Sequence, residues 1–189
     1  MNHIRTLMSF ELPKFTDHLL RLDGEDRRLR FGHRISDAEI EAFVAGLEKG
    51  RFRVLAHFDD ELNVAATALL SALNDGSVEF AFSVDRPLRQ KGLCTSLFDR
   101  AILWARNRRI DRAYLYTLAE HRQMRHLART AGMHLDVEAG GCEGVLDLPP
   151  ATPLTLLREI LAEQAGMYDT ATKANHLALA HLRTLRKAA

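Results

Sequence analysis

The stretch from residue 84 to residue 97 reads VDRPLRQKGLCTSL. The residues before it, 78–84, are apolar, rich in aromatic side chains and bounded by turn residues, which predicts a β-strand. After it, apolar residues recur at the spacing of an α-helix: Leu93, Leu97, Phe98, Ala101, Ile102 and Ala105. A strand, a turn and a helix N-terminus direct several backbone N–H groups to one point, and Gly92 leaves room there for a phosphate. The stretch therefore predicts an anion-binding loop.

Within this stretch, Arg89–Cys94 resembles the Q/R-x-x-G-x-G/A signature of the GNAT superfamily of acetyl-CoA-dependent N-acyltransferases. Arg89 and Gly92 match the signature, whereas Cys94 stands where the family has Gly or Ala. Because the side chain of Cys94 is small and backbone donors do not depend on it, we expect the loop to keep its shape. The alternative interpretation is a basic turn before an ordinary helix.

Two further segments extend the resemblance over residues 3–148. Residues 118–133 are similar to the family's segment L-x-E-N-x-x-M-x-x-L-A-x-x-x-G-F/M, with His121 in place of the usual Asn. The stretch Leu29–Gly32 and the helix predicted after it resemble a subset of bacterial members whose substrates are mostly unassigned.

The expected secondary structure follows from apolar periodicity and turn residues. Strands are expected at 4–10, 53–58, 63–73, 77–85, 112–117, 134–138 and 143–148, and helices at 13–22, 36–50, 93–107 and 122–131. Asp23–Asp26 is expected to break the first helix, and Asn74–Gly76 to form a hairpin turn. Beyond Pro149 and Pro150, two amphipathic helices are expected at 153–165 and 167–185.

This order fits an α/β (α+β) class fold, which the resemblance makes a GNAT fold. We expect a mixed, mostly antiparallel central sheet flanked by helices. Residues 1–148 would form the acetyltransferase domain, and residues 149–189 a C-terminal helical extension. An apolar face on that extension is expected to be buried on its own domain or on a second subunit, as in a homodimer: Leu157, Ile160, Leu161, Tyr168, Ala171, Leu177 and Leu185.

Composition excludes several classes of function. The chain has 189 residues, of which 47% are hydrophobic and 27% charged, and its net charge is +1. So small a charge supplies no overall field for nucleic acid or an anionic membrane. No apolar run is long enough to span a bilayer and no signal peptide is visible, so a cytoplasmic location is expected. Cys94 and Cys142 form no metal-type pair, and the histidines lack metal-ligand spacing, so no metal is expected.

The resemblance implies acetyl-CoA as co-substrate and assigns its contacts. The pantetheine arm would lie along the backbone of Phe82, Ser83 and Val84, as an added strand pairs with an exposed edge. The pyrophosphate would bind the backbone of the loop residues Arg89, Gln90, Lys91, Gly92, Leu93, Cys94 and Thr95. His121, at the position of the family's Asn, is included among the residues that contact the cofactor.

Glu79 is the candidate general base. A lysine-like amine with a pKa of ~10.4 must lose a proton before it attacks, which costs about 4.6 kcal/mol at pH 7. Glu79–Phe82 resembles the region where protein-lysine-acetylating members carry their catalytic glutamate, and alternation puts Glu79 on the same face as Ala81 and Ser83. The alternative is a strand-edge carboxylate that is solvated or paired with an arginine.

The general acid is left unassigned. Many family members use a tyrosine near the position of Ala128, and none is present there. Tyr114 and Tyr116 lie on the preceding strand and are expected to pack.

The sequence therefore predicts acetyl transfer from a coenzyme A thioester to an amine of a small molecule or protein, by direct attack in a ternary complex, because no nucleophile–base pair is visible. The acceptor stays unidentified, although Leu29–Gly32 and Gly140–Cys142 are expected to flank it. The alternative is a catalytically silent acyl-CoA-binding or interaction module.

Overall fold

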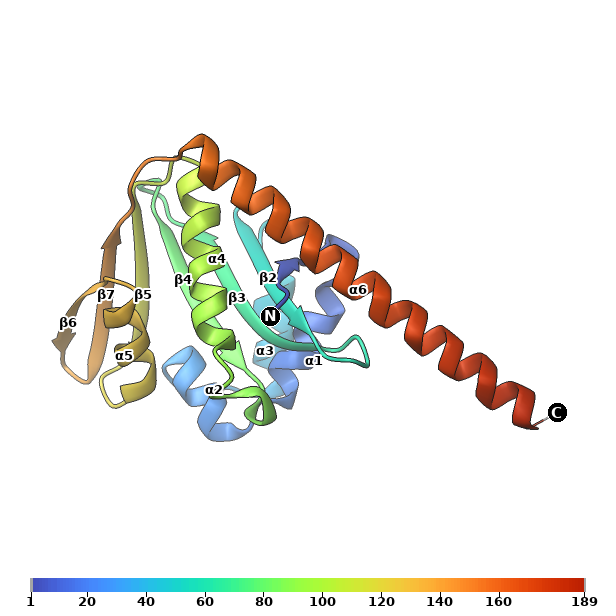
Figure 1. The fold of residues 1–189 in the computed structure, drawn as a ribbon. Helices are drawn as coiled ribbons and strands as arrows, with labels where there is room; N and C mark the ends of the chain where they lie inside the picture. Colours follow the sequence, from blue (N-terminus) through green and yellow to red (C-terminus); the bar gives the residue numbers. More distant parts are fainter. Residues whose placement is uncertain (1, 189) are drawn as a thin grey trace.

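The sheet of this protein has seven strands in the order β1-β2-β3-β4-β5-β7-β6 (Figure 1). We describe a computed structural model, which covers the backbone of residues 2–188 and the side chains of residues 2–184. The strands are β1 (Arg5–Thr6), β2 (Phe52–Phe58), β3 (Val64–Ala72), β4 (Val78–Val84), β5 (Arg112–Leu118), β6 (His134–Glu138) and β7 (Gly141–Asp147). β4 and β5 are parallel, and every other pairing in the described chain is antiparallel.

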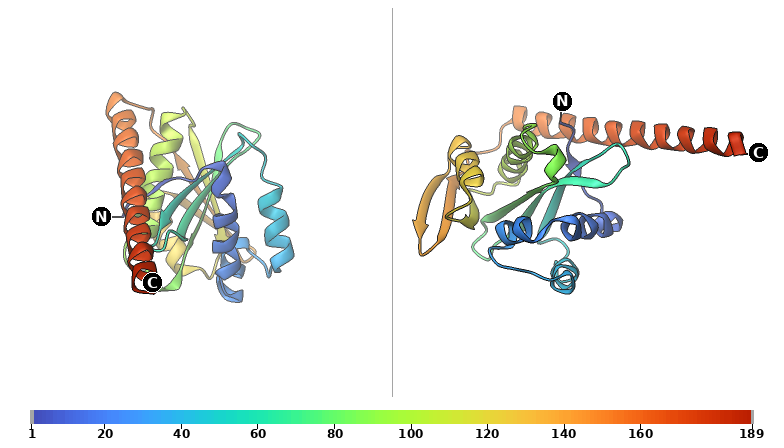
Figure 2. Two further views of the ribbon diagram at one scale, coloured as in Figure 1. Left: turned by 90° about the vertical axis from the view of Figure 1, so that its right-hand side faces the viewer. Right: turned by 90° about the horizontal axis from the view of Figure 1, so that it is seen from below.

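Helices cover both faces of the sheet (Figure 2). They are α1 (Leu12–Arg21), α2 (Gly24–Phe31), α3 (Asp37–Ala45), α4 (Leu93–Asn107), α5 (Arg122–Thr130) and α6 (Pro153–Ala188). α1, α2 and α3 lie on one face, and α4 and α5 lie on the other. The predicted fold class, a mixed and mostly antiparallel sheet flanked by helices with a C-terminal helical extension, is confirmed.

Alternation along β4 sends its side chains to both faces. Phe80 and Phe82 pack against Phe98 of α4, with ring centroids 6.0 and 4.8 Å apart. Ser83 points to the opposite face and contacts His18 of α1. The strand is thus anchored by aromatic packing on one side, while its other side carries polar groups into the molecule.

Three local expectations are corrected. The first strand covers only Arg5–Thr6 rather than residues 4–10, and a short 3-10 helix follows at Ser9–Glu11. Asp23–Asp26 does not end helical structure but starts α2, because the Asp23 carboxylate accepts the backbone N–H of Asp26 at 2.9 Å as an N-cap. α3 ends at Ala45, ahead of the expected Gly50.

The C-terminal extension is one helix of 36 residues, not two. α6 runs along α4 and across the edge strand β1 (Figure 1). Its inner face is polar: Glu163 accepts the backbone N–H of Thr6 at 2.8 Å and pairs with Arg100 at 2.9 Å. Gly166 allows the close approach, because a Cβ there would lie 2.8 Å from the carbonyl oxygen of Ile4. The helix therefore covers an exposed sheet edge.

The predicted burial of the apolar face of α6 on its own domain is wrong. Most of its members face solvent, with exposed fractions of 51% for Leu157, 55% for Leu161 and 76% for Tyr168. Leu185 lies outside the described side chains. Burial of this face against a second subunit stays a prediction. Within residues 2–188, no helix is both long and apolar enough to cross a lipid bilayer.

Candidate active site

The candidate site lies where β4 and β5 separate. The two strands pair only through Val78 with Ala113 and Glu79 with Tyr114. Past Glu79, β4 keeps its hydrogen bonds to β3 but has no partner on its other edge within the described residues. A cavity of about 430 Å³ occupies the gap, a size typical of small-molecule sites. The free edge of β4 leaves backbone N–H and C=O groups available to an extended ligand.

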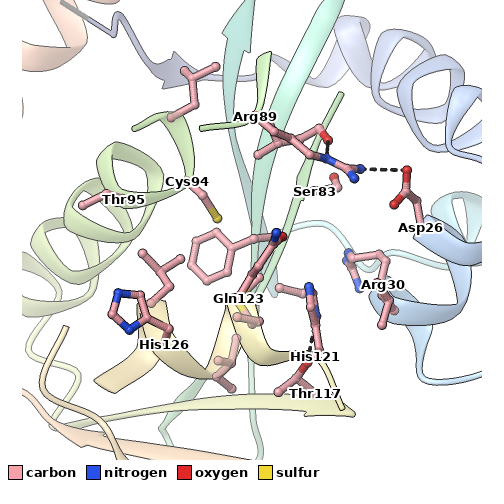
Figure 3. A pocket seen from close by; sticks show the side chains of 18 of the residues that line it. Asp26, Arg30, Ser83, Arg89, Cys94, Thr95, Thr117, His121, Gln123 and His126 are labelled. Carbon is pink, nitrogen blue, oxygen red and sulfur yellow. Dashed lines mark hydrogen bonds and ion pairs between the residues drawn. The ribbon is translucent and has the colours of Figure 1, made fainter. Parts of the chain in front are cut away.

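The cavity is lined by five parts of the chain (Figure 3). β4 and β5 form its walls, and the loop before α4, helix α2 and helix α5 close it. The polar side chains among the lining residues are Asp26, Arg30, Ser83, Arg89, Gln90, Thr95, Tyr116, Thr117, His121, Gln123 and His126. The lining thus mixes apolar residues with several polar groups, as a site for an amphipathic ligand requires.

The loop after β4 ends at an uncapped helix N-terminus. Gln90 and Gly92 adopt positive φ angles of 62° and 73°, and α4 begins at Leu93 without a side-chain cap. The first backbone N–H groups of a helix have no intrahelical partner. Those of α4, a helix of 15 residues, are therefore free to bind an anion with the help of the helix dipole.

Most residues predicted to contact the cofactor line this one cavity: Phe82, Ser83, Val84, Arg89, Gln90, Gly92, Leu93, Cys94, Thr95 and His121. Lys91 and Glu79 are not among its lining residues. The Arg89 guanidinium is turned toward α2, where its Nη2 lies 2.7 Å from the Asp26 carboxylate and its Nε donates to the carbonyl of Val84 at 3.1 Å. Arg89 thus fixes the loop against α2, and anion binding by the loop falls to its backbone.

Glu79 sits at the closed end of the gap, in the last rung between β4 and β5. Its side chain is half-buried. Burial raises the pKa of Glu79, and the positive charge of Arg30 only partly opposes this shift. A carboxylate with a raised pKa is a better proton acceptor than an ordinary one. The Gly140–Cys142 turn, expected to flank the acceptor, does not line the cavity, whereas Leu29 and Arg30 do.

Two lining groups are kept uncharged near neutral pH. Burial raises the pKa of Cys94 to about 12, so its thiol stays protonated and is a poor nucleophile. Burial, helped by the charge of Arg89, lowers the pKa of His121. The ring of His121 is held by Thr117, whose Oγ1 lies 3.2 Å from Nδ1. Neither group provides a charge for an anionic ligand.

A buried polar network under β4 was missed by sequence reasoning. His18 Nε2 lies 2.8 Å from the hydroxyl of Ser83, which also lies 2.8 Å from the hydroxyl of Thr67. His18 Nδ1 is 3.0 Å from the carboxylate of Asp85, although it is off the hydrogen-bond axis. The order Ser–His–Asp is that of an activated nucleophile, but Nδ1 of His18 makes no hydrogen bond to Asp85, and the Ser83 hydroxyl also contacts Thr67. No sequence signal links His18 and Ser83, which are 65 residues apart.

Comparisons with known proteins agree with this geometry. A sequence model described as the Acetyltransferase (GNAT) family matches residues 16–133. No curated protein matches the chain. Among solved structures, the GNAT domain of S. lividans PAT is 19% identical and superposes with a TM-score of 0.65, covering 77% of this chain and 89% of that one.

Two other solved structures superpose similarly. The ribosomal-protein-S18-alanine N-acetyltransferase from Escherichia coli is 16% identical, with a TM-score of 0.61 over 81% of this chain and 97% of that one. Spermidine N-acetyltransferase from Vibrio cholerae, solved with CoA and spermine, is 16% identical, with a TM-score of 0.60 over 76% of this chain and 94% of that one. At such identities the likeness concerns the fold.

Proposed function

Because this chain belongs to the GNAT family of acetyltransferases, we propose that it transfers an acetyl group from acetyl-CoA to the amine of a small molecule or protein. The observation that carries the proposal is the gap between β4 and β5. There, an unpaired strand edge leads directly into an uncapped helix N-terminus across one cavity. An extended peptide-like arm that ends in a pyrophosphate needs this pair of features side by side.

Acetyl-CoA would lie with its pantetheine arm against the backbone of Phe82, Ser83 and Val84. Its pyrophosphate would accept hydrogen bonds from the free backbone N–H groups of Leu93, Cys94 and Thr95. Burial keeps the Cys94 thiol neutral, so it adds no negative charge beside the pyrophosphate. In this orientation the thioester reaches along β4 toward Glu79. His121 would border the arm from the α5 side of the cavity.

In the proposed reaction, Glu79 accepts the proton that the amine must lose. The neutral nitrogen attacks the thioester carbonyl, so a C–N bond forms and the C–S bond breaks. The leaving group is the thiolate of CoA, which takes up the second proton that the nitrogen releases as the amide forms; the group that passes this proton on stays unassigned. Burial keeps the pKa of Glu79 raised, which brings it closer to the pH at which a general base works best.

We propose attack within a ternary complex rather than through an acyl-enzyme. Two hydroxyls among the described lining residues lie beside a histidine. Thr117 Oγ1 lies 3.2 Å from Nδ1 of His121, and the Ser83 hydroxyl is engaged by both His18 and Thr67 in a buried network. Such a closed network favours a structural role, in which it fixes the end of β4 where the pantetheine arm would bind.

A thiol-release assay over a panel of amines tests this function. The expected result is release of CoA that requires both acetyl-CoA and an amine, with the acetyl group recovered on the amine by mass spectrometry. Binding of acetyl-CoA without release, whatever amine is offered, would instead support the alternative of a catalytically silent acyl-CoA-binding module.

A further inference from the structure

Helix α2 carries three arginines, and two of them are fully engaged. Arg27 pairs with Asp37 at 2.6 Å and donates to the carbonyl of Leu22 at 2.9 Å. Arg28 binds the carboxylates of Glu25 and Glu120. Arg30 makes no hydrogen bond and no ion pair with any described residue, although it is the one of the three that lines the cavity.

The guanidinium of Arg30 has no hydrogen-bond or ion-pair partner among the described residues. Its Nη2 is fully buried and lacks an acceptor in the described chain. Burial lowers the pKa of Arg30 to about 10, while the nearby charge of Glu79 opposes this shift, so the group is still charged at neutral pH. Its Cζ lies over the face of Phe31, 4.9 Å from the ring centroid. A buried donor without an acceptor is costly, and an acceptor supplied by a ligand in the cavity would remove that cost.

Arg30 lies on the α2 side of the cavity, one helical turn past Asp26, the residue that contacts Arg89 of the anion-binding loop. Its charge partly opposes the rise in the pKa of Glu79, which lies at the start of β4, whereas the loop follows the end of that strand. Asp26, the carboxylate near the loop, does not pair with Arg30, because it already forms an ion pair with Arg89 at 2.7 Å. Figure 3 shows Arg30 projecting from α2 on the opposite side of the cavity from α4.

We propose that Arg30 binds a carboxylate carried by the substrate, beside the position of the reacting thioester. This inference rests on the proposed function and names its substrate class. The carboxylate belongs either to the acceptor, as in an amino acid or a peptide, or to the acyl group, as in a dicarboxylic acyl-CoA. The planar fork of Arg30 suits bidentate binding of either one.

Matched acceptor pairs test the proposal. Each amino acid is assayed beside the amine that remains when its carboxylate is removed, such as lysine beside cadaverine, with acetyl-CoA as donor. Succinyl-CoA beside acetyl-CoA, with one uncharged amine, tests the acyl group. Wild type is compared with Arg30→Met, Arg30→Lys and the control Arg28→Met, which removes a cation from the same helix but not from the cavity.

Arg30→Met should lower kcat/KM for the carboxylate-bearing substrate by at least about 30-fold. It should change kcat/KM for the matched substrate without the carboxylate by less than about threefold. Arg30→Lys should restore part of the loss, because it keeps the charge but not the fork. Arg28→Met should resemble wild type. Taking the ratio within each pair removes any general effect of Arg30 on Glu79. Equal losses for both members of every pair would overturn the inference.

A binding measurement separates this inference from the proposed function. Amino acids and their decarboxylated amines, and succinyl-CoA beside acetyl-CoA, are titrated by calorimetry, the amines in the presence of CoA. Carboxylate-dependent binding that disappears in Arg30→Met supports the site even if no amine is acetylated, in which case only the proposed function fails. If the two members of each pair bind with equal affinity, in wild type and in Arg30→Met alike, the inference is overturned.

Discussion

Glu79 lies opposite Tyr114 in the last rung that joins β4 to β5. Up to this rung the two strands form an ordinary parallel pair, and beyond it they part around the cavity. The carboxylate is therefore held at the point where the sheet opens, between the buried core and the site. This position explains why burial raises the pKa of Glu79, and it puts the proposed base at the closed end of the gap.

Replacing this carboxylate should impair transfer more than binding. We expect Glu79→Gln to lower kcat/KM for an amine by at least ~100-fold, with little change in the affinity for CoA. Wild-type activity should fall as the pH drops through the raised pKa of Glu79, because the protonated form accepts no proton. The defect of Glu79→Gln should shrink as the pH rises toward the pKa of the amine, since solution then supplies the neutral amine. A loss that is equal at every pH would point to a positioning role.

Gly92 should be essential to the anion-binding loop. Gly92→Glu places a carboxylate where the pyrophosphate would bind, so we expect affinity for CoA to fall at least about tenfold by calorimetry. Gly92→Ala is the matched control, because both variants force a side chain onto a residue whose φ is 73°. A Cβ at Gly92 meets only the Asn2 side chain, at 3.9 Å. If Gly92→Glu binds CoA as tightly as Gly92→Ala, the loop assignment is wrong.

The buried ion pair under the N-terminus should make stability depend on pH. Glu11 receives both Nη atoms of Arg5, at 2.7 and 2.6 Å. Burial raises the pKa of Glu11, but the hydrogen bonds from Arg5 and Met8 and the charge of Arg5 outweigh it, so the pKa lies below its usual value of 4.5. Because the pKa of Glu11 is lower in the folded state than in the unfolded state, its carboxylate stabilises the fold at pH values above the unfolded-state pKa. This stabilisation is lost as the pH falls through the folded-state pKa.

Glu11→Gln should therefore cost about 3 kcal/mol of unfolding free energy at pH 7, measured by urea denaturation. The difference from wild type should narrow as the pH falls below 4.5, because a protonated glutamate resembles glutamine. Glu48→Gln is the control: its exposed carboxylate lies 3.7 Å from Arg51 and should contribute under about 1 kcal/mol. A pH-independent difference for Glu11→Gln would contradict the assignment.

Much of the site was predictable, because local sequence patterns specify the elements that form it. β4 and α4 have clear periodicity, and Gly92 marks the turn between them, so most loop residues predicted to bind the cofactor do line one cavity. What failed has physical causes. Asp23 and Gly24 predict a break in helical structure, yet Asp23 caps α2, the helix that brings Arg30 to the cavity. The contact of His18 with Ser83 is made by tertiary packing alone.

Gly166 illustrates a second cause of error. A glycine predicts a helix end in isolation, but in α6 it is kept because the backbone of Ile4 presses against it. Gly166→Ala should thus destabilise the protein by about 1–3 kcal/mol in thermal unfolding, because the Cβ forces α6 from β1. An undocked helix would gain about 1 kcal/mol from the same change, so stabilisation would refute the docking. Gly24→Ala, with no atom within 4 Å of its Cβ, is the control.

The most direct test of the central claim is a two-substrate initial-rate measurement, in which CoA release is followed while acetyl-CoA and an accepted amine are varied together. We predict release that depends on the amine, with intersecting reciprocal plots, as direct attack in a ternary complex requires. Parallel plots, together with an acetyl group found on Ser83, would contradict the proposed mechanism. Tight binding of acetyl-CoA with no amine-dependent release would contradict the proposed enzyme itself.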